Sequence, residues 1–92
     1  MELKDARVQI DAVDNELVQL LVKRFDICCE VARIKMRDGL PVLHPAREDE
    51  VAARMAELGQ PYGEEISALF REIMKTSVQL QKKLIAESGC NT

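Results

Sequence analysis

Apolar residues recur every three or four positions along the first part of the chain: Leu3, Ala6, Ile10, Val13, Leu17, Leu20, Leu21, Ile27, Cys28, Val31 and Ile34. This spacing is typical of an amphipathic helix with one apolar face. No Gly or Pro interrupts it before Gly39, which Pro41 follows, and that pair marks a helix end. The pattern therefore predicts a long first helix over about residues 4–37.

Two further helices follow. The segment AREDEVAARMAEL comes directly after Pro45, and its early acidic residues suit the start of a helix. This predicts a short helix over 45–58, which the breaking segment GQPYG ends. A medium helix is predicted over 64–88, where Ile66, Leu69, Phe70, Ile73, Leu80 and Leu84 share one side. The expected fold class is all-α, with three helices in a single domain covering residues 1–92.

The first helix is too long for a compact monomer. About 34 residues span roughly 50 Å, whereas a globule of this size has a radius of gyration of about 12 Å. The helix should therefore project beyond its own chain and expose part of its apolar stripe. A homodimer in which the long helices lie alongside each other is the simplest closed arrangement that covers the stripe.

Composition excludes several classes of protein. The net charge is −3 and the cations are not clustered, which argues against nucleic-acid binding. Cys28 and Cys29 are adjacent and the chain has one His, so neither a disulfide between them nor a zinc site is expected. With no signal-peptide pattern and no membrane span, we expect a cytoplasmic protein. The chain has no spare length for a fused second enzyme, so a free-standing subunit is expected.

Two permanent cations interrupt the apolar stripe of the first helix. Arg24 and Lys35 are eleven residues apart on one face, which places their α-carbons about 16 Å apart. Two long side chains leaning toward each other could bracket a small anion. Arg7 also borders the stripe, but it lies roughly 25 Å from Arg24 along the helix axis. Only a neighbour related by two-fold symmetry could bring its Arg7 to the other chain's Arg24.

The other two helices add polar groups that complete a possible pocket. The second helix contributes Arg47 and Glu48 near its start, and the third contributes Ser77 and Gln81 on one face. Burying this much charge is costly unless it is paired. Glu48 can neutralise one cation, and the remaining positive charge calls for a dianionic ligand.

Each of these residues alone also fits an ordinary role. Arg24 fits a cation at a bundle edge or one paired with a partner's acid, and Lys35 fits a cation near a helix end. The other candidates fit ordinary solvated residues or polar positions of a helical bundle: Arg7, Arg47, Glu48, Ser77 and Gln81. A helical interaction module without catalysis therefore stays open as an alternative. The coincidence of all these positions favours an anion-binding helical dimer.

At these same residues the chain resembles the all-helical chorismate mutases of the bacterial type II family, which are intertwined three-helix homodimers. The resemblance extends from about Leu3 to Leu84. It rests on RVQIDAVDNELVQLLVKRFDICCEVARIK in the first helix, GLPVLHPARE in the loop and second helix, and SVQLQ in the third. The complete set is far more specific than any of its short pieces.

The resemblance implies a Claisen rearrangement of chorismate to prephenate in aromatic amino acid biosynthesis, which needs no cofactor and no metal. Lys35 and Gln81 are implied as donors to the ether oxygen, where negative charge gathers in the transition state. Glu48 is implied as the acceptor for the ring hydroxyl. A neutral Gln81 donates at every ordinary pH, so a broad pH profile is expected.

The resemblance also assigns substrate-binding residues. Arg24 should bind a substrate carboxylate together with Arg7 of the other subunit, and Arg47 should bind a carboxylate from the second helix. Ser77 should support carboxylate binding. His44 departs from the family pattern, because some relatives have an Asp there whose backbone amide contacts the substrate. An exposed loop residue before the second helix is the ordinary interpretation of His44.

Two other reactions on the same fold stay open. The related isochorismate pyruvate lyases have an apolar residue at the position of Glu48 and a Tyr at that of Ser77, so both residues favour a mutase. A mutase acting on aminodeoxychorismate is also possible, because a carboxylate accepts from an ammonium as readily as from a hydroxyl.

Overall fold

The computed structural model describes residues 1–89, which form three helices and no strand. Helix α1 spans Leu3–Asp38, α2 spans Pro45–Leu58 and α3 spans Gly63–Gly89. The prediction of one long, one short and one medium helix is confirmed. Each helix begins and ends within one residue of its expected bound.

Local chemistry accounts for the loop between α1 and α2. Gly39 ends α1 in a left-handed conformation with φ of 68°, which costs glycine little but strains any residue with a Cβ. Leu40 N–H then donates to Lys35 O at 2.8 Å. At the start of α2, Pro45 occupies the first helical turn, and His44 caps it by accepting from Arg47 N–H. The loop is therefore fixed at both ends.

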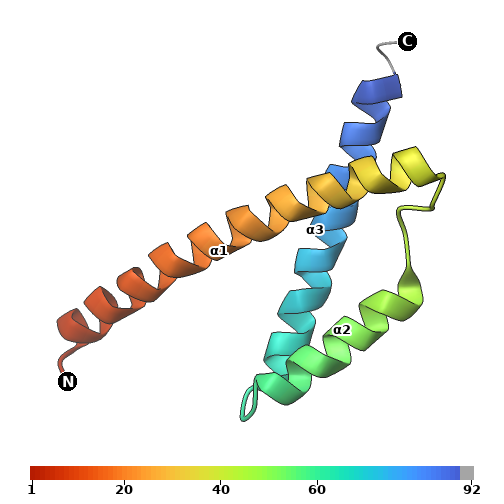
Figure 1. The fold of residues 1–92 in the computed structure, drawn as a ribbon. Coiled ribbons are helices and arrows are strands. Elements are labelled where there is room, and N and C mark those ends of the chain that lie inside the picture. Colours follow the sequence, from red (N-terminus) through yellow and green to blue (C-terminus); the bar gives the residue numbers. More distant parts are fainter. Residues whose placement is uncertain (90–92) are drawn as a thin grey trace.

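The helices are arranged around α3. Helix α2 packs along α3, and the C-terminal half of α1 crosses α3 further along (Figure 1). No α-carbon of α1 comes within 8 Å of one in α2. The small core lies between α2 and α3, where Val51, Ala52 and Met74 are buried and Met55 and Phe70 pack against them. Helices α1 and α2 thus each pack against α3 and not against each other.

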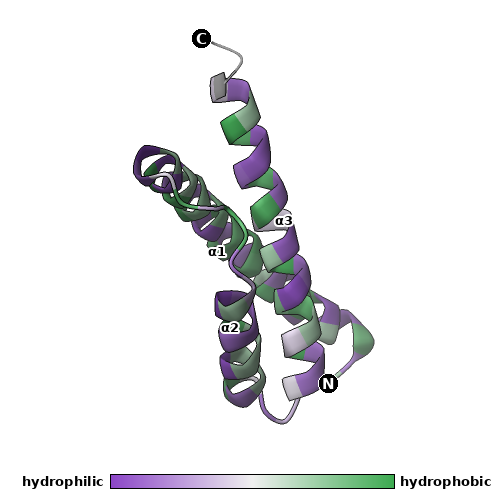
Figure 2. Ribbon diagram, turned by 90° about the vertical axis from the view of Figure 1, so that its right-hand side faces the viewer, coloured by the Kyte–Doolittle hydropathy of each residue, from purple (hydrophilic) through white to green (hydrophobic). Residues whose placement is uncertain are grey.

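The N-terminal half of α1 extends away from the rest of the chain (Figure 1), so the molecule measures 58 × 27 × 14 Å with a radius of gyration of 16.6 Å. Hydrophobic and hydrophilic positions alternate along all three helices (Figure 2). On the extended half, Leu3, Ile10, Val13, Leu17 and Leu20 are between 50% and 65% exposed. The projection of the first helix with an uncovered apolar stripe is therefore confirmed.

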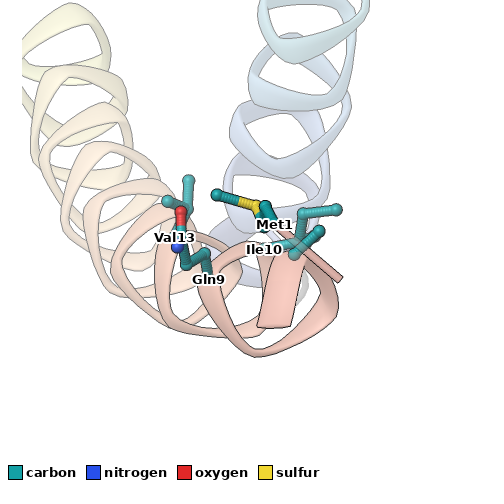
Figure 3. A pocket seen from close by; sticks show the side chains of 5 residues that line it. Met1, Gln9, Ile10 and Val13 are labelled. Carbon is teal, nitrogen blue, oxygen red and sulfur yellow. The ribbon is translucent and has the colours of Figure 1, made fainter. Parts of the chain in front are cut away.

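A shallow hollow of about 360 Å³ lies on this extended half (Figure 3). Met1, Ala6, Gln9, Ile10 and Val13 line it, so every lining residue comes from α1 or the segment just before it. No ionisable side chain is among them. The hollow is part of the uncovered apolar surface rather than an enclosed polar site.

No helix within residues 1–89 is both long and apolar enough to cross a membrane.

Candidate anion-binding site

A cavity of about 230 Å³ lies where α1, α2, α3 and the loop between α1 and α2 meet. Seven of the eight predicted site residues line it: Arg24, Lys35, His44, Arg47, Glu48, Ser77 and Gln81. They are distant in sequence, and the crossing of α1 over α3 brings them together. Arg7 is the exception. It is exposed on the extended half of α1 and does not line the cavity, as expected for a residue that a second chain would have to supply.

Arg24 is half-buried and lies against α3. Its Nη1 donates to Ser77 Oγ at 3.1 Å and approaches Cys28 Sγ at 3.7 Å. Its guanidinium carbon lies 6.0 Å from the centre of the Phe70 ring. A guanidinium has five N–H donors, so the Nε and Nη2 groups stay available to an anion.

Ser77 and Gln81 are the buried polar residues of α3, each only 6% exposed. Ser77 Oγ donates to Ile73 O at 2.9 Å, and Gln81 Nε2 donates to Cys28 O at 2.8 Å. The contact from Gln81 crosses from α3 to α1 and fixes the amide with its nitrogen toward α1. One N–H of that amide is used, and the second is available to a ligand.

Lys35 is held by the loop that follows α1. Its Nζ donates to Val42 O at 2.8 Å, and the left-handed turn at Gly39 is what returns the loop toward it. An ammonium has three N–H donors, so two remain. Lys35 is half-buried, which places a cation at the edge of the cavity with most of its donor capacity unused.

The first turn of α2 contributes His44, Arg47 and Glu48. His44 Nδ1 accepts from Arg47 N–H at 3.0 Å, and the exposed Arg47 side chain pairs with Glu50 at 2.8 Å. Glu48, which could neutralise one cavity cation, forms no ion pair within residues 1–89. No α-carbon of α2 lies within 8 Å of one in α1.

The cavity combines excess positive charge with an apolar wall. The lining includes the three cations Arg24, Lys35 and Arg47 and one carboxylate, that of Glu48, which gives the cavity lining a net charge of +2, while Arg47 pairs with Glu50 outside it. The wall is formed by Val31, Val42, Val51, Met74 and Val78. The cavity also has hydrogen-bond donors on Gln81 and Lys35 and an acceptor on Glu48. Such a site suits a small dianion that has an apolar face and a polar substituent.

Sequence reasoning missed some of the groups that shape this site. In the sequence Cys28 counts only as an apolar position of the first helix, but its thiol and carbonyl contact Arg24 and Gln81. No signal in the sequence reveals a backbone acceptor used by a residue 53 positions away. The capping role of His44 could have been found, because a Pro in the first turn of a helix places the preceding residue at its N-cap.

The chain is similar in sequence to several known proteins. The chain is 29% identical over 90 residues to a chorismate mutase from Methanocaldococcus jannaschii, covering 95% of this chain and 91% of that protein. It is 33% identical over 89 residues to a bifunctional chorismate mutase/prephenate dehydratase from Aquifex aeolicus, covering 90% of this chain and 25% of that protein. The chain thus spans only about a quarter of the bifunctional relative.

A third relative is a 4-amino-4-deoxychorismate mutase from Streptomyces venezuelae, 34% identical over 62 residues, or 67% of this chain and 60% of that protein. No solved structure matches the chain significantly. The family model described as chorismate mutase type II matches residues 6–82, which include all eight predicted site residues. The chain belongs to the chorismate mutase type II family.

Proposed function

We propose that this protein is a chorismate mutase that rearranges chorismate to prephenate. The observation that carries the proposal is the convergence of seven predicted residues on one cavity whose lining carries a net positive charge. Chorismate is a dianion with a compact ring, so its charge and shape match the cationic groups and the apolar wall. The full-length match to a relative named chorismate mutase supports the same reaction.

Binding would use the unused donors of the arginines. Arg24 presents Nε and Nη2 to one substrate carboxylate, with Ser77 holding Nη1 from behind. Arg47 reaches a carboxylate after releasing Glu50, an exchange of low cost because exposed ion pairs contribute little. Arg7 of a second copy would complete the first carboxylate site. The proposed assembly is an intertwined homodimer acting in the cytoplasm, and the uncovered stripe of α1 supports the dimer.

Rate enhancement would come from conformer selection and electrostatics. The reaction is intramolecular: one carbon–oxygen bond breaks as one carbon–carbon bond forms, and no proton moves. Gln81 and Lys35 each have N–H groups left to donate to the ether oxygen, where negative charge develops. Glu48 forms no ion pair within residues 1–89 and is free to accept from the ring hydroxyl. Holding the folded conformer lowers the entropic part of the barrier.

An aminodeoxychorismate mutase is the second candidate. It is favoured by the relative of that name and by the free carboxylate of Glu48, which would accept from an ammonium. An isochorismate pyruvate lyase is less well supported, because Glu48 and Ser77 both line the cavity at positions where the sequence already favours a mutase.

The test is to incubate purified protein separately with chorismate, isochorismate and aminodeoxychorismate, and to identify the products. Conversion of chorismate to prephenate is expected, with kcat lowered about 100-fold to 1,000-fold by Lys35→Ala, because a donor to the developing oxyanion is removed. Lys23→Ala is the matched control, since Lys23 is an exposed lysine of α1 outside the cavity. Turnover of isochorismate alone would contradict the proposal. Preference for the amino analogue would favour the second candidate.

A further inference from the structure

Arg24 differs from four of the exposed arginines in the partners that hold it. Within residues 1–89, ion pairs with carboxylates are formed by Arg33, Arg37, Arg47 and Arg71. Arg24 instead contacts a hydroxyl, a thiol and an aromatic ring, all neutral. Its position is therefore set by groups that leave its positive charge uncompensated.

The aromatic ring is that of Phe70 on α3. Phe70 precedes Ser77 by seven residues, so the two side chains share one face of the helix. The ring packs against the core of Val51, Ala52 and Met74, which fixes its orientation. The face of a phenyl ring carries partial negative charge and attracts a guanidinium within about 6 Å of its centre, and the observed separation is 6.0 Å.

We propose that Phe70 is a positioning residue for Arg24. The ring face and the Ser77 hydroxyl both hold the guanidinium, and its Nε and Nη2 groups are left without a hydrogen-bond acceptor in residues 1–89 and available to a ligand in the cavity. A carboxylate in the place of the ring would hold Arg24 equally well but would neutralise the charge that binds the anion. The ring therefore combines fixed geometry with retained charge. The chemical identity of the anion, a substrate carboxylate, rests on the proposed function.

This role makes an electronic prediction that a purely structural role does not. Fluorine substitution withdraws electrons from the ring face and weakens its attraction for a cation, while ring size changes little. A series of mono-, di- and trifluorophenylalanine at position 70 should raise KM for chorismate stepwise, with kcat nearly unchanged. Phe70→Leu should raise KM about threefold to fivefold, and Phe70→Tyr, which keeps the ring, should restore it.

Phe25 supplies the matched control. It is also a half-buried phenylalanine and is a neighbour of Arg24 in sequence, and like Phe70 it does not line the cavity. The ring that lies over the Arg24 guanidinium is that of Phe70. Trifluorophenylalanine at position 25 should leave KM unchanged. A graded rise in KM confined to position 70, with an unaltered melting temperature, would support the proposal. Equal KM values across the position-70 series would overturn it.

A second readout separates this inference from the proposed function. The side-chain resonances of Arg24 should show a ring-current shift that disappears in Phe70→Leu, and its absence from the unsubstituted protein would overturn the proposal. If the unsubstituted protein does not convert chorismate, the proposed function fails, and the fluorination series is scored by titration of sulfate against the same Arg24 resonances. A sulfate dissociation constant that rises with fluorination then supports the role of Phe70, and one that stays constant overturns it.

Discussion

The two halves of α1 carry similar apolar stripes but have different surroundings. In the C-terminal half, α3 covers part of the stripe: Ala32 is fully buried, whereas Ile27 and Ile34 are 54% and 44% exposed. Arg24 and Lys35 there have defined acceptors on Ser77 and Val42. In the N-terminal half, Ile10 and Val13 are more than half exposed, and Arg7 has no place in the cavity. One uninterrupted helix connects the two halves, and this difference in their surroundings is what supports the proposal that a second chain covers the first half.

The largest effect is expected from placing a charge on the uncovered half. Val13→Glu would bury a carboxylate in the proposed dimer interface and should abolish association. Each cavity would then lack the partner's Arg7, and activity should fall about 1,000-fold. Sedimentation equilibrium and prephenate formation measure the two effects.

Asn15→Glu is the control for this change, since it adds the same charge on nearly the opposite side of the helix. A Val13→Glu protein that stays dimeric would contradict the proposal that the N-terminal half of α1 lies in the dimer interface. One that is monomeric and fully active would contradict the proposal that Arg7 of a second chain completes the site.

The next effect tests whether the two halves serve one site from different chains. Arg7→Ala and Arg24→Ala should each lower kcat/KM about 100-fold or more, because each removes a charged hydrogen-bond partner of a carboxylate. When the two variants are unfolded and refolded together, mixed dimers should contain one intact site and one doubly defective site. The mixture should regain about a quarter of the unsubstituted activity.

No recovery on mixing would mean that Arg7 and Arg24 act within the same chain or not at all. Refolding each variant alone under the same conditions is the control, and neither should regain activity.

A smaller and pH-dependent effect is expected at the contact between α3 and the C-terminal half of α1. In Gln81→Glu, an ionised carboxylate can only accept hydrogen bonds, so it would repel Cys28 O and the ether oxygen. Activity near neutral pH should fall about 100-fold. It should rise as the pH is lowered and the carboxyl takes up a proton, whereas the unsubstituted protein should keep a broad profile.

The measurement is kcat/KM from about pH 4 to about pH 8. Parallel pH profiles for Gln81→Glu and the unsubstituted protein would remove Gln81 from the role of donor.

The smallest effect concerns the competition between Glu50 and the ligand for Arg47. Their ion pair is exposed on both sides, and such pairs contribute at most about 1 kcal/mol. Glu50→Gln should therefore lower KM about twofold and leave kcat unchanged, because Arg47 no longer exchanges partners on binding. Glu57→Gln, an equal change of charge further along α2, should leave KM as it is. A higher KM for Glu50→Gln would show that the pair positions Arg47 instead.

The sequence predicted the helices and the shared face of Arg24 and Lys35 because both depend on local periodicity. It also predicted that one chain cannot bring Arg7 to Arg24, since helix geometry alone sets that distance. The lack of an ion pair at Glu48 within residues 1–89 could not be predicted, because it depends on how α1 and α2 are placed around α3. The contact of Phe70 with Arg24 likewise depends on the crossing of two helices. The roles of the site residues in catalysis remain predictions.

Two of the proposed donors are anchored to the main chain of another segment: Lys35 to the carbonyl of Val42, and Gln81 to that of Cys28. Every amino acid supplies that carbonyl, so selection can exchange the side chains at positions 42 and 28 without removing either anchor. Both side chains line the cavity. Descendants of this protein could therefore reshape the wall one residue at a time to admit a different ring substituent, while inheriting the same pair of donors.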